Sequence, residues 1–315
     1  MIHLRVVSPS DLTEKIIALL GGDPGVLNLV VLPGRARNPD GDAIECDVLG
    51  GTANTVLPIL RHHLLMGQRG SIVIEPGELA ISGRVAEVGA QRLGALANAP
   101  VWDAVEARIR ADGRTSASFY LFLIIAGIIG AVGILTNSQI LIVAAMVLGP
   151  EYGAITSIAL GLDQHSGKAV REGLFALTIG FLGAIVAAFA FALLVRVLGL
   201  EPTAFRLGIR PVTNLIDTPN IYSLVVAILA GVVGIVSLTH ARTSTLLGVF
   251  ISVTTIPAAS DIGVASAFGS WSEARGSLLQ LLLNVVVLIL VGLLTLRFVR
   301  LLWRRVRARG DREGK

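Results

Sequence analysis

Four long stretches of this chain contain no aspartate, glutamate, lysine or arginine. They cover residues 115–150, 173–195, 218–241 and 276–296. A helix needs about 20 apolar residues to cross the hydrocarbon core of a bilayer, and each stretch is at least that long. Charged residues make up only 15% of the chain, against about 25% in soluble domains. The stretches therefore predict a protein that crosses a membrane several times as α-helices.

The pattern predicts six crossings, of which two are interrupted. Pro150 and Pro257 lie inside the second and fifth apolar runs, and a proline in a helix interior removes a backbone hydrogen bond. We therefore expect an α-helical polytopic membrane bundle with two broken helices. The expected crossings are residues 118–136, 138–160, 172–195, 220–238, 243–268 and 276–298.

The sequence predicts a membrane domain of residues 118–300 that contains an internal repeat. Repeat one covers residues 118–198, and repeat two covers residues 220–298. Each repeat has an apolar helix, a segment broken by proline and a third apolar helix. Because each repeat has an odd number of crossings, the two copies must be inverted relative to each other. A 3+3 inverted repeat with broken helices is typical of secondary transporters, which bind substrate near the bilayer midplane.

Each break carries one acidic residue, Glu151 in the first and Asp261 in the second. A carboxylate at membrane depth costs at least about 2.5 kcal/mol and often marks an ion or proton path. The alternative is that each acid faces water near the interface. Broken backbone must be covered by protein or water, so we expect the two breaks to meet. The residues expected to line a substrate or ion pathway are Gly149, Pro150, Glu151, Gly153, Pro257, Ser260, Asp261, Asn137, Ser138, Gln280 and Asn284.

Residues 1–77 predict a small soluble α+β domain. Its elements follow the order β-α-β-β-α-β, which is the ferredoxin-like arrangement. We expect a polar turn over residues 33–42 and a second helix over residues 54–66, with Pro58 in the first turn of that helix, where a proline is tolerated. Cys46 is the only cysteine, so an intrachain disulfide is impossible. Open sheet edges favour self-association, and we expect a homo-oligomer.

Residues 78–117 form the expected linker between the soluble and membrane domains. In its second half, Trp102, Val105 and Ile109 recur at spacings of three and four, which predicts a helix with one apolar face. This helix either lies along the membrane surface or packs against the protein in the ordinary way. The residues expected to contact lipid are Trp102, Arg304, Arg305 and Arg307.

The basic residues predict the orientation of the chain. Residues 301–315 form a tail rich in arginine, and such clusters stay cytoplasmic. Six crossings then place the N-terminus in the cytoplasm too, although Arg206 and Arg210 lie in a loop that would face outward. We expect a multi-pass protein of the bacterial cytoplasmic membrane. The net charge of +4 is explained by the tail beside anionic lipid, so no nucleic-acid partner is expected.

The first repeat carries a motif of three parts: a Gly-x-Leu-x-Asn-Ser turn, an Ala-Met pair and a break centred on proline. In this chain the parts are Gly133-Ile134-Leu135-Thr136-Asn137-Ser138, Ala144-Ala145-Met146 and Gly149-Pro150. The motif resembles the bacterial membrane family catalogued as domain of unknown function number 389, or uncharacterised hydrophobic domain. The resemblance covers residues 118–296 and implies a polytopic membrane protein with an N-terminal soluble extension, but no particular activity. Family members usually have small or apolar residues after the first proline, so Glu151 and Asp261 depart from the pattern.

Three functions are compatible with these features. The first is a transporter or channel-like protein for a small solute or ion, with a cytoplasmic regulatory domain. The second is a membrane-anchored sensor or scaffold whose soluble domain binds a small ligand or partner. The third, an intramembrane enzyme using Glu151 and Asp261, has the least support because no nucleophile or metal constellation accompanies them. We expect no enzymatic activity, no cofactor and no metal.

Overall fold

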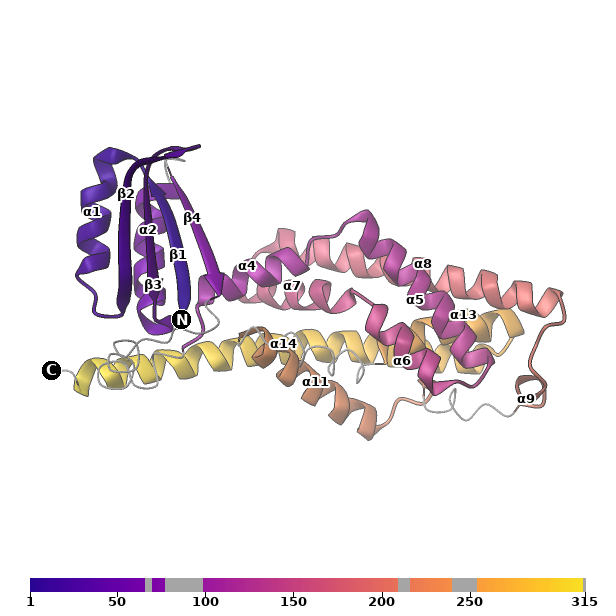
Figure 1. Cartoon of the computed structure of the whole chain (residues 1–315). Coiled ribbons are helices and arrows are strands. Elements are labelled where there is room, and N and C mark those ends of the chain that lie inside the picture. Colours follow the sequence, from indigo (N-terminus) through magenta and orange to yellow (C-terminus); the bar gives the residue numbers. More distant parts are fainter. Residues whose placement is uncertain (66–69, 77–98, 209–215, 240–253, 314–315) are drawn as a thin grey trace. The chain divides into compact units, whose positions relative to one another are not determined.

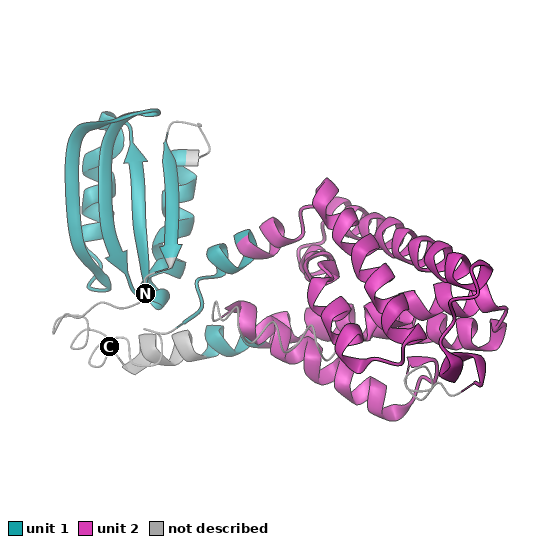
Figure 2. Cartoon of the chain, turned by 45° about the vertical axis from the view of Figure 1, so that its right-hand side comes forward, with its two compact units in different colours: residues 1–107, 299–315 teal, residues 108–298 magenta. Residues whose placement is uncertain are grey.

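The computed structural model describes residues 1–65, 70–76, 99–208, 216–239 and 254–313 of the 315-residue chain (Figure 1). The chain divides into two compact units (Figure 2). Unit 1 comprises Met1–Ala107 and Val299–Lys315, and unit 2 comprises Arg108–Phe298. The expected linker is thus shared between the units, and the basic tail belongs to the same unit as the N-terminal domain.

Unit 1 contains a four-stranded sheet with the strand order β2-β3-β1-β4. All neighbouring strands are antiparallel, and Leu4 in the central strand pairs with Cys46 on one side and Ile74 on the other. The strands and helices follow one another in the predicted succession. They are β1 (Ile2–Ser8), α1 (Ser10–Gly21), β2 (Val26–Arg37), β3 (Asp40–Val48), α2 (Gly50–Leu65) and β4 (Ser71–Pro76).

The core of unit 1 lies between this sheet and its two helices. Alternate strand residues are buried because side chains of a strand point to opposite faces in turn. These buried strand residues pack against the apolar stripes of α1 and α2. Members of the core include Leu4, Val6, Ile16, Leu20, Ile44, Cys46, Leu57, Leu60 and Leu64.

Two local predictions in unit 1 were wrong. Residues 33–42 are mostly strand, since β2 and β3 continue as a hairpin in which Ala36 pairs with Gly41. The backbone N–H and C=O groups there form the hydrogen bonds of a strand pair, which the polar side chains do not prevent. The second helix begins at Gly50 and not near residue 54, so Pro58 lies inside it. Pro58 is exposed.

Unit 2 is helical and apolar. Among the described residues, four helices are long and apolar enough to cross a membrane, namely α5, α8, α11 and the part Trp271–Arg305 of α14, which continues into unit 1. Helices α6 and α7 are bent by 49° relative to each other. If this pair is counted as one broken span, the described residues contain five spans. The first half of the expected fifth crossing lies outside the described residues. The helices are α4 (Trp102–Asp112, shared with unit 1), α5 (Ala117–Leu135), α6 (Gln139–Leu148), α7 (Glu151–Asp163), α8 (Gly167–Val197), α9 (Thr203–Arg206), α11 (Ile221–Thr239), α13 (Thr255–Phe268) and α14 (Trp271–Glu313).

Large apolar side chains cover the outside of these helices. Leu121, Phe175, Leu229 and Leu282 each expose more than half of their surface. Extended apolar surface of this kind is rare on soluble monomers, whereas it suits contact with lipid. The helices of unit 2 therefore have the surface of a membrane protein.

Small residues bring the helices of unit 2 close together. Helix α8 packs against α5, α7 and α13. A Cβ atom added at Gly127 of α5 would lie 2.7 Å from the carbonyl oxygen of Ala184, and one added at Gly263 of α13 would lie 2.7 Å from that of Ile185. Backbones can approach this closely only where a side chain is missing, which is the usual way that membrane helices associate.

Candidate functional site

The two proline-containing segments are in direct contact. Helix α6 ends at Leu148 and α7 begins at Glu151, with Gly149 and Pro150 forming the break between them. Glu151 is 104 residues from Thr255 in the sequence, yet its Oε1 accepts a hydrogen bond of 2.6 Å from the Thr255 hydroxyl. A Cβ atom at Gly149 would lie 2.8 Å from Cγ1 of Ile256. The structure thus brings the first break against the start of α13.

Pro257 itself does not interrupt a helix. It is the third residue of α13, which begins at Thr255, and proline is tolerated in the first turn because the backbone N–H there has no helical partner. The expected break inside the second repeat is therefore a helix start at this point. What precedes Thr254 lies outside the described residues.

A second group of polar side chains joins α13 to α14. The amide nitrogen of Asn284 donates to the Thr254 hydroxyl at 2.9 Å. The amide nitrogen of Gln280 donates to Oδ1 of Asn284 at 3.3 Å and lies 3.5 Å from the Thr254 hydroxyl. Gln280 and Asn284 are four residues apart and share a helix face, as the sequence indicates.

Asp261 has a buried partner of its own. Its Oδ2 accepts a hydrogen bond of 2.6 Å from the Ser277 hydroxyl on α14, and the residue is 1% exposed. Ser260, the preceding residue, donates to the Ile256 carbonyl oxygen at 2.9 Å. We name this set the buried polar cluster, with members Glu151, Thr254, Thr255, Ser260, Asp261, Ser277, Gln280 and Asn284.

Two oxygens of the cluster accept no hydrogen bond from any described residue. They are Oε2 of Glu151 and Oε1 of Gln280, and both are buried. A buried acceptor without a partner costs about 1–3 kcal/mol, and more for a charged group. Native proteins keep few such atoms, and each needs an explanation. A carboxylate oxygen and an amide oxygen are both ligands for a hard cation, and a carboxylate also accepts a proton.

Other expected pathway residues have structural roles. Ser138 caps α6, where its hydroxyl accepts from the Leu141 backbone N–H at 3.5 Å. Asn137, at the turn before it, has a positive φ of 56°, which asparagine tolerates better than most residues. Gly153 lets α7 approach Asp112, since a Cβ atom there would collide with the Asp112 carbonyl oxygen.

Sequence reasoning missed the hydroxyl partners Thr254, Thr255 and Ser277. Each lies in an apolar run within three residues of an expected pathway residue. Proximity of that kind is a usable signal, because a hydroxyl at membrane depth needs a hydrogen-bond partner.

The expected lipid-contact residues lie at the end of α14 and the start of α4. Trp102 and Trp303 are half-buried within unit 1, whereas Arg304 and Arg305 are exposed. The Arg300 guanidinium lies 5.1 Å from the centre of the Trp102 ring. This contact favours the ordinary packing role for the start of α4. The side chain of Arg307 lies outside the described residues.

The described residues include histidine, cysteine, aspartate and glutamate, the side chains that usually bind transition metals. Within that part of the chain, no group of three or more histidine, cysteine, aspartate or glutamate side chains could hold a metal ion. A site for a transition metal normally draws on such groups.

Residues 146–290 match the model of a family described as "Domain of unknown function (DUF389)". This segment is similar to the domains of that family. The match confirms the resemblance drawn from the motif, and it includes Glu151, Asp261 and both proline-containing segments. The family description names no activity. No curated protein matches the chain, and no solved structure matches it.

Proposed function

We propose that this chain is a transporter or channel-like protein that passes a small cation or protonated solute across the bilayer through the buried polar cluster. The proposal depends on the environment of Glu151. Its Oε1 accepts a hydrogen bond from Thr255, while its Oε2 is buried without a hydrogen-bond partner among the described residues. Irregular backbone and acidic side chains persist inside membrane proteins where they line a path.

The sign of the expected charge follows from the lining atoms. Glu151 and Asp261 are the acidic members of the buried polar cluster, and no lysine or arginine belongs to it. Carboxylates attract cations and repel anions. A proton or a monovalent cation therefore fits the cluster better than an anionic solute does.

The remaining architecture completes this proposal. The six crossings form an inverted repeat. Both termini are cytoplasmic in a bacterial inner membrane, and the ferredoxin-like domain regulates flux from that side. The protein works as a homo-oligomer embedded in lipid and needs no cofactor or nucleic acid.

The scaffold alternative has one specific observation in its favour. Gly127 and Gly263 allow backbone contacts so close that the bundle has little room to move there. A rigid bundle suits assembly as well as it suits transport. An enzymatic role has no comparable support, since no nucleophile with an adjacent base accompanies the two acids among the described residues.

The first test is cation flux in liposomes containing the purified protein. Glu151→Gln keeps an oxygen that accepts the Thr255 hydroxyl but removes the charge, so we expect flux to fall by about tenfold or more. The measurement is proton or sodium entry, followed with an ion-sensitive dye under an imposed gradient.

The matched control is Glu172→Gln, which changes an exposed acid on α8 that lies 3.9 Å from Lys168. We expect this variant to keep full flux. Elution volume and melting temperature of each variant check that the bundle is folded. Equal flux in Glu151→Gln and the parent protein excludes the cluster as the path.

A further inference from the structure

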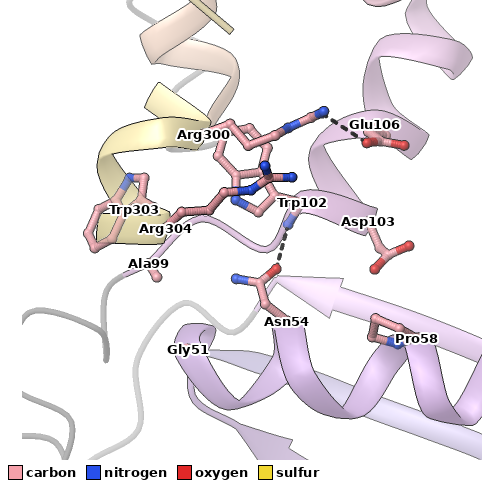
Figure 3. Close-up of a pocket in the computed structure, with 10 residues that line it drawn as sticks. All are labelled: Gly51, Asn54, Pro58, Ala99, Trp102, Asp103, Glu106, Arg300, Trp303 and Arg304. Atoms are coloured by element: carbon pink, nitrogen blue, oxygen red, sulfur yellow. Dashed lines mark hydrogen bonds and ion pairs between the residues drawn. The ribbon is translucent and has the colours of Figure 1, made fainter. Parts of the chain in front are cut away.

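Unit 1 contains a cavity of about 300 Å³ that is separate from the buried polar cluster. It is formed by three parts of the chain: the start of α2, the start of α4 and the end of α14 (Figure 3). All of its lining residues belong to unit 1. Its volume is at the lower end of the range for small-molecule sites, which is enough for one metabolite-sized ligand.

Aromatic side chains form much of its wall. Trp102 and Trp303 both line the cavity, and the whole chain has only three tryptophans. The Trp102 backbone N–H donates to Asn54 Oδ1 at 3.0 Å, and the Arg300 guanidinium lies 5.1 Å from the centre of the Trp102 ring. Figure 3 shows the Trp102 ring beside the Arg300 and Arg304 side chains. An indole offers a flat face for stacking a planar ring.

Both acidic residues that line the cavity are paired with an arginine, and a further arginine lines it as well. Glu106 pairs with Arg300 at 3.1 Å, and Asp103 pairs with Arg61. Arg304 lines the cavity and is exposed, and it forms no ion pair with any described residue. An arginine presents a planar fork of donors that fits a phosphate or carboxylate.

We propose that this cavity binds a small organic phosphate that carries an aromatic ring, of the class of a mononucleotide. The ring packs against Trp102 and Trp303, and the phosphate takes the guanidinium of Arg304. Gly51, the second residue of α2, also lines the cavity. The proposal does not depend on transport, but it supplies the expected regulatory domain with a ligand.

The test is calorimetric titration of adenosine monophosphate into the full chain, held in nanodiscs of zwitterionic lipid. We expect saturable binding with one site per chain and a dissociation constant below about 1 mM. Arg304→Ala removes the charge-assisted contact and weakens binding by about tenfold or more. Trp303→Ala weakens it by a similar factor, while Trp303→Phe, which keeps a flat ring, retains most of the affinity.

Two matched variants control for charge and for loss of an indole. Arg305→Ala removes an exposed arginine next in the chain that does not line the cavity, and Trp271→Phe changes an exposed tryptophan in unit 2. Both keep parental affinity if the cavity is the site. Adenosine and ribose 5-phosphate, each with half of the recognised chemistry, bind at least about tenfold more weakly than the nucleotide.

Several results would overturn the proposal. They are the absence of saturable binding at about 1 mM ligand, equal losses in the Arg304 and Arg305 variants, and binding that is indifferent to Trp303→Ala. The proposal also fails if the chain binds vesicles of anionic lipid in a way that requires Arg304 but does not bind nucleotide. That result assigns Arg304 to a lipid surface. Melting temperature confirms that each variant is folded.

Discussion

The two units of this protein differ in how they pack and in what they expose. Unit 1 encloses large apolar side chains such as Leu4, Leu60 and Ile44 between a sheet and two helices. Unit 2 encloses glycine and alanine beside larger residues such as Leu123 and Ile155, and it exposes leucine and phenylalanine on the outside of its helices. Water drives the first arrangement through the hydrophobic effect, while lipid offers no such force and leaves close packing to hold the helices.

The buried acidic residues of the two units also differ in how many of their carboxylate oxygens have hydrogen-bond donors. In unit 1, Asp42 accepts from the Thr13 hydroxyl at 2.6 Å and from the Gly34 backbone N–H at 2.7 Å, so each carboxylate oxygen has a donor. In unit 2, one oxygen of Glu151 accepts from Thr255 and the other accepts from no described residue. A satisfied buried acid completes a fold, whereas an unsatisfied one indicates a functional site.

The largest effect expected from this comparison is on the core of unit 1. Leu60 is fully buried, and Leu60→Ala should destabilise unit 1 by about 2–5 kcal/mol through lost burial and a cavity. Leu229 of α11 is 59% exposed, so Leu229→Ala should change the stability of unit 2 by less than about 0.5 kcal/mol in detergent. A cost for Leu229→Ala as large as that for Leu60→Ala contradicts the lipid-facing assignment.

Cys46 provides the measurement for unit 1. It is the only cysteine, it is buried, and burial raises the pKa of its thiol to about 12. A thiol reagent at neutral pH therefore reacts only when unit 1 opens. The rate of labelling against urea concentration reports the stability of unit 1 separately, and intrinsic fluorescence with elution volume reports on the whole chain.

A second, smaller effect tests the close packing of unit 2. Gly263→Ala places a methyl group 2.7 Å from backbone atoms of Ile185 and Phe189, which cannot move aside as a flexible side chain can. We expect a loss of about 1–3 kcal/mol, seen as a lower melting temperature in detergent. Gly167, at the start of α8, has nothing within 4 Å of the same position, so Gly167→Ala should be neutral or slightly stabilising. Equal melting temperatures for the two variants contradict the packing described for α13 and α8.

The smallest expected effect is the pH dependence of unit 1. The Thr13 hydroxyl, followed by the Gly34 backbone N–H, holds the pKa of Asp42 below its ordinary value. A depressed pKa in the folded state stabilises unit 1 above the unfolded value, about 3.9. The stabilisation is lost as the pH falls from there through the folded pKa. The urea midpoint for labelling of Cys46 should fall below about pH 4, and less so in Asp42→Asn, when the label is a dipyridyl disulfide that still reacts with thiols in acid.

Asp40→Asn, an exposed acid in the same hairpin, serves as the control. It should leave the acid dependence of unit 1 unchanged. A parental response to acid in Asp42→Asn shows that other groups of unit 1 control its pH dependence.

Several features were predictable from local sequence. The alternation of Ile44, Cys46 and Val48 indicates a half-buried strand, and the structure has it in β3. The spacing of Gln280 and Asn284 places them on one helix face, where they form a hydrogen bond. The start of α2 was not predictable, because Gly50 and Gly51 look like a turn and Pro58 looks like a helix beginning.

By itself, the sequence determined that much of this chain lies in a membrane and that its N-terminal part alternates strands with helices. Those properties depend on the length, period and charge of neighbouring residues. Only the tertiary structure decided that Thr255 is the partner of Glu151, that Ser277 is the partner of Asp261, and that the last residues of the chain belong with the N-terminal domain. Hydroxyl residues are common in membrane helices, and which of them meets an acid depends on which helix faces pack together.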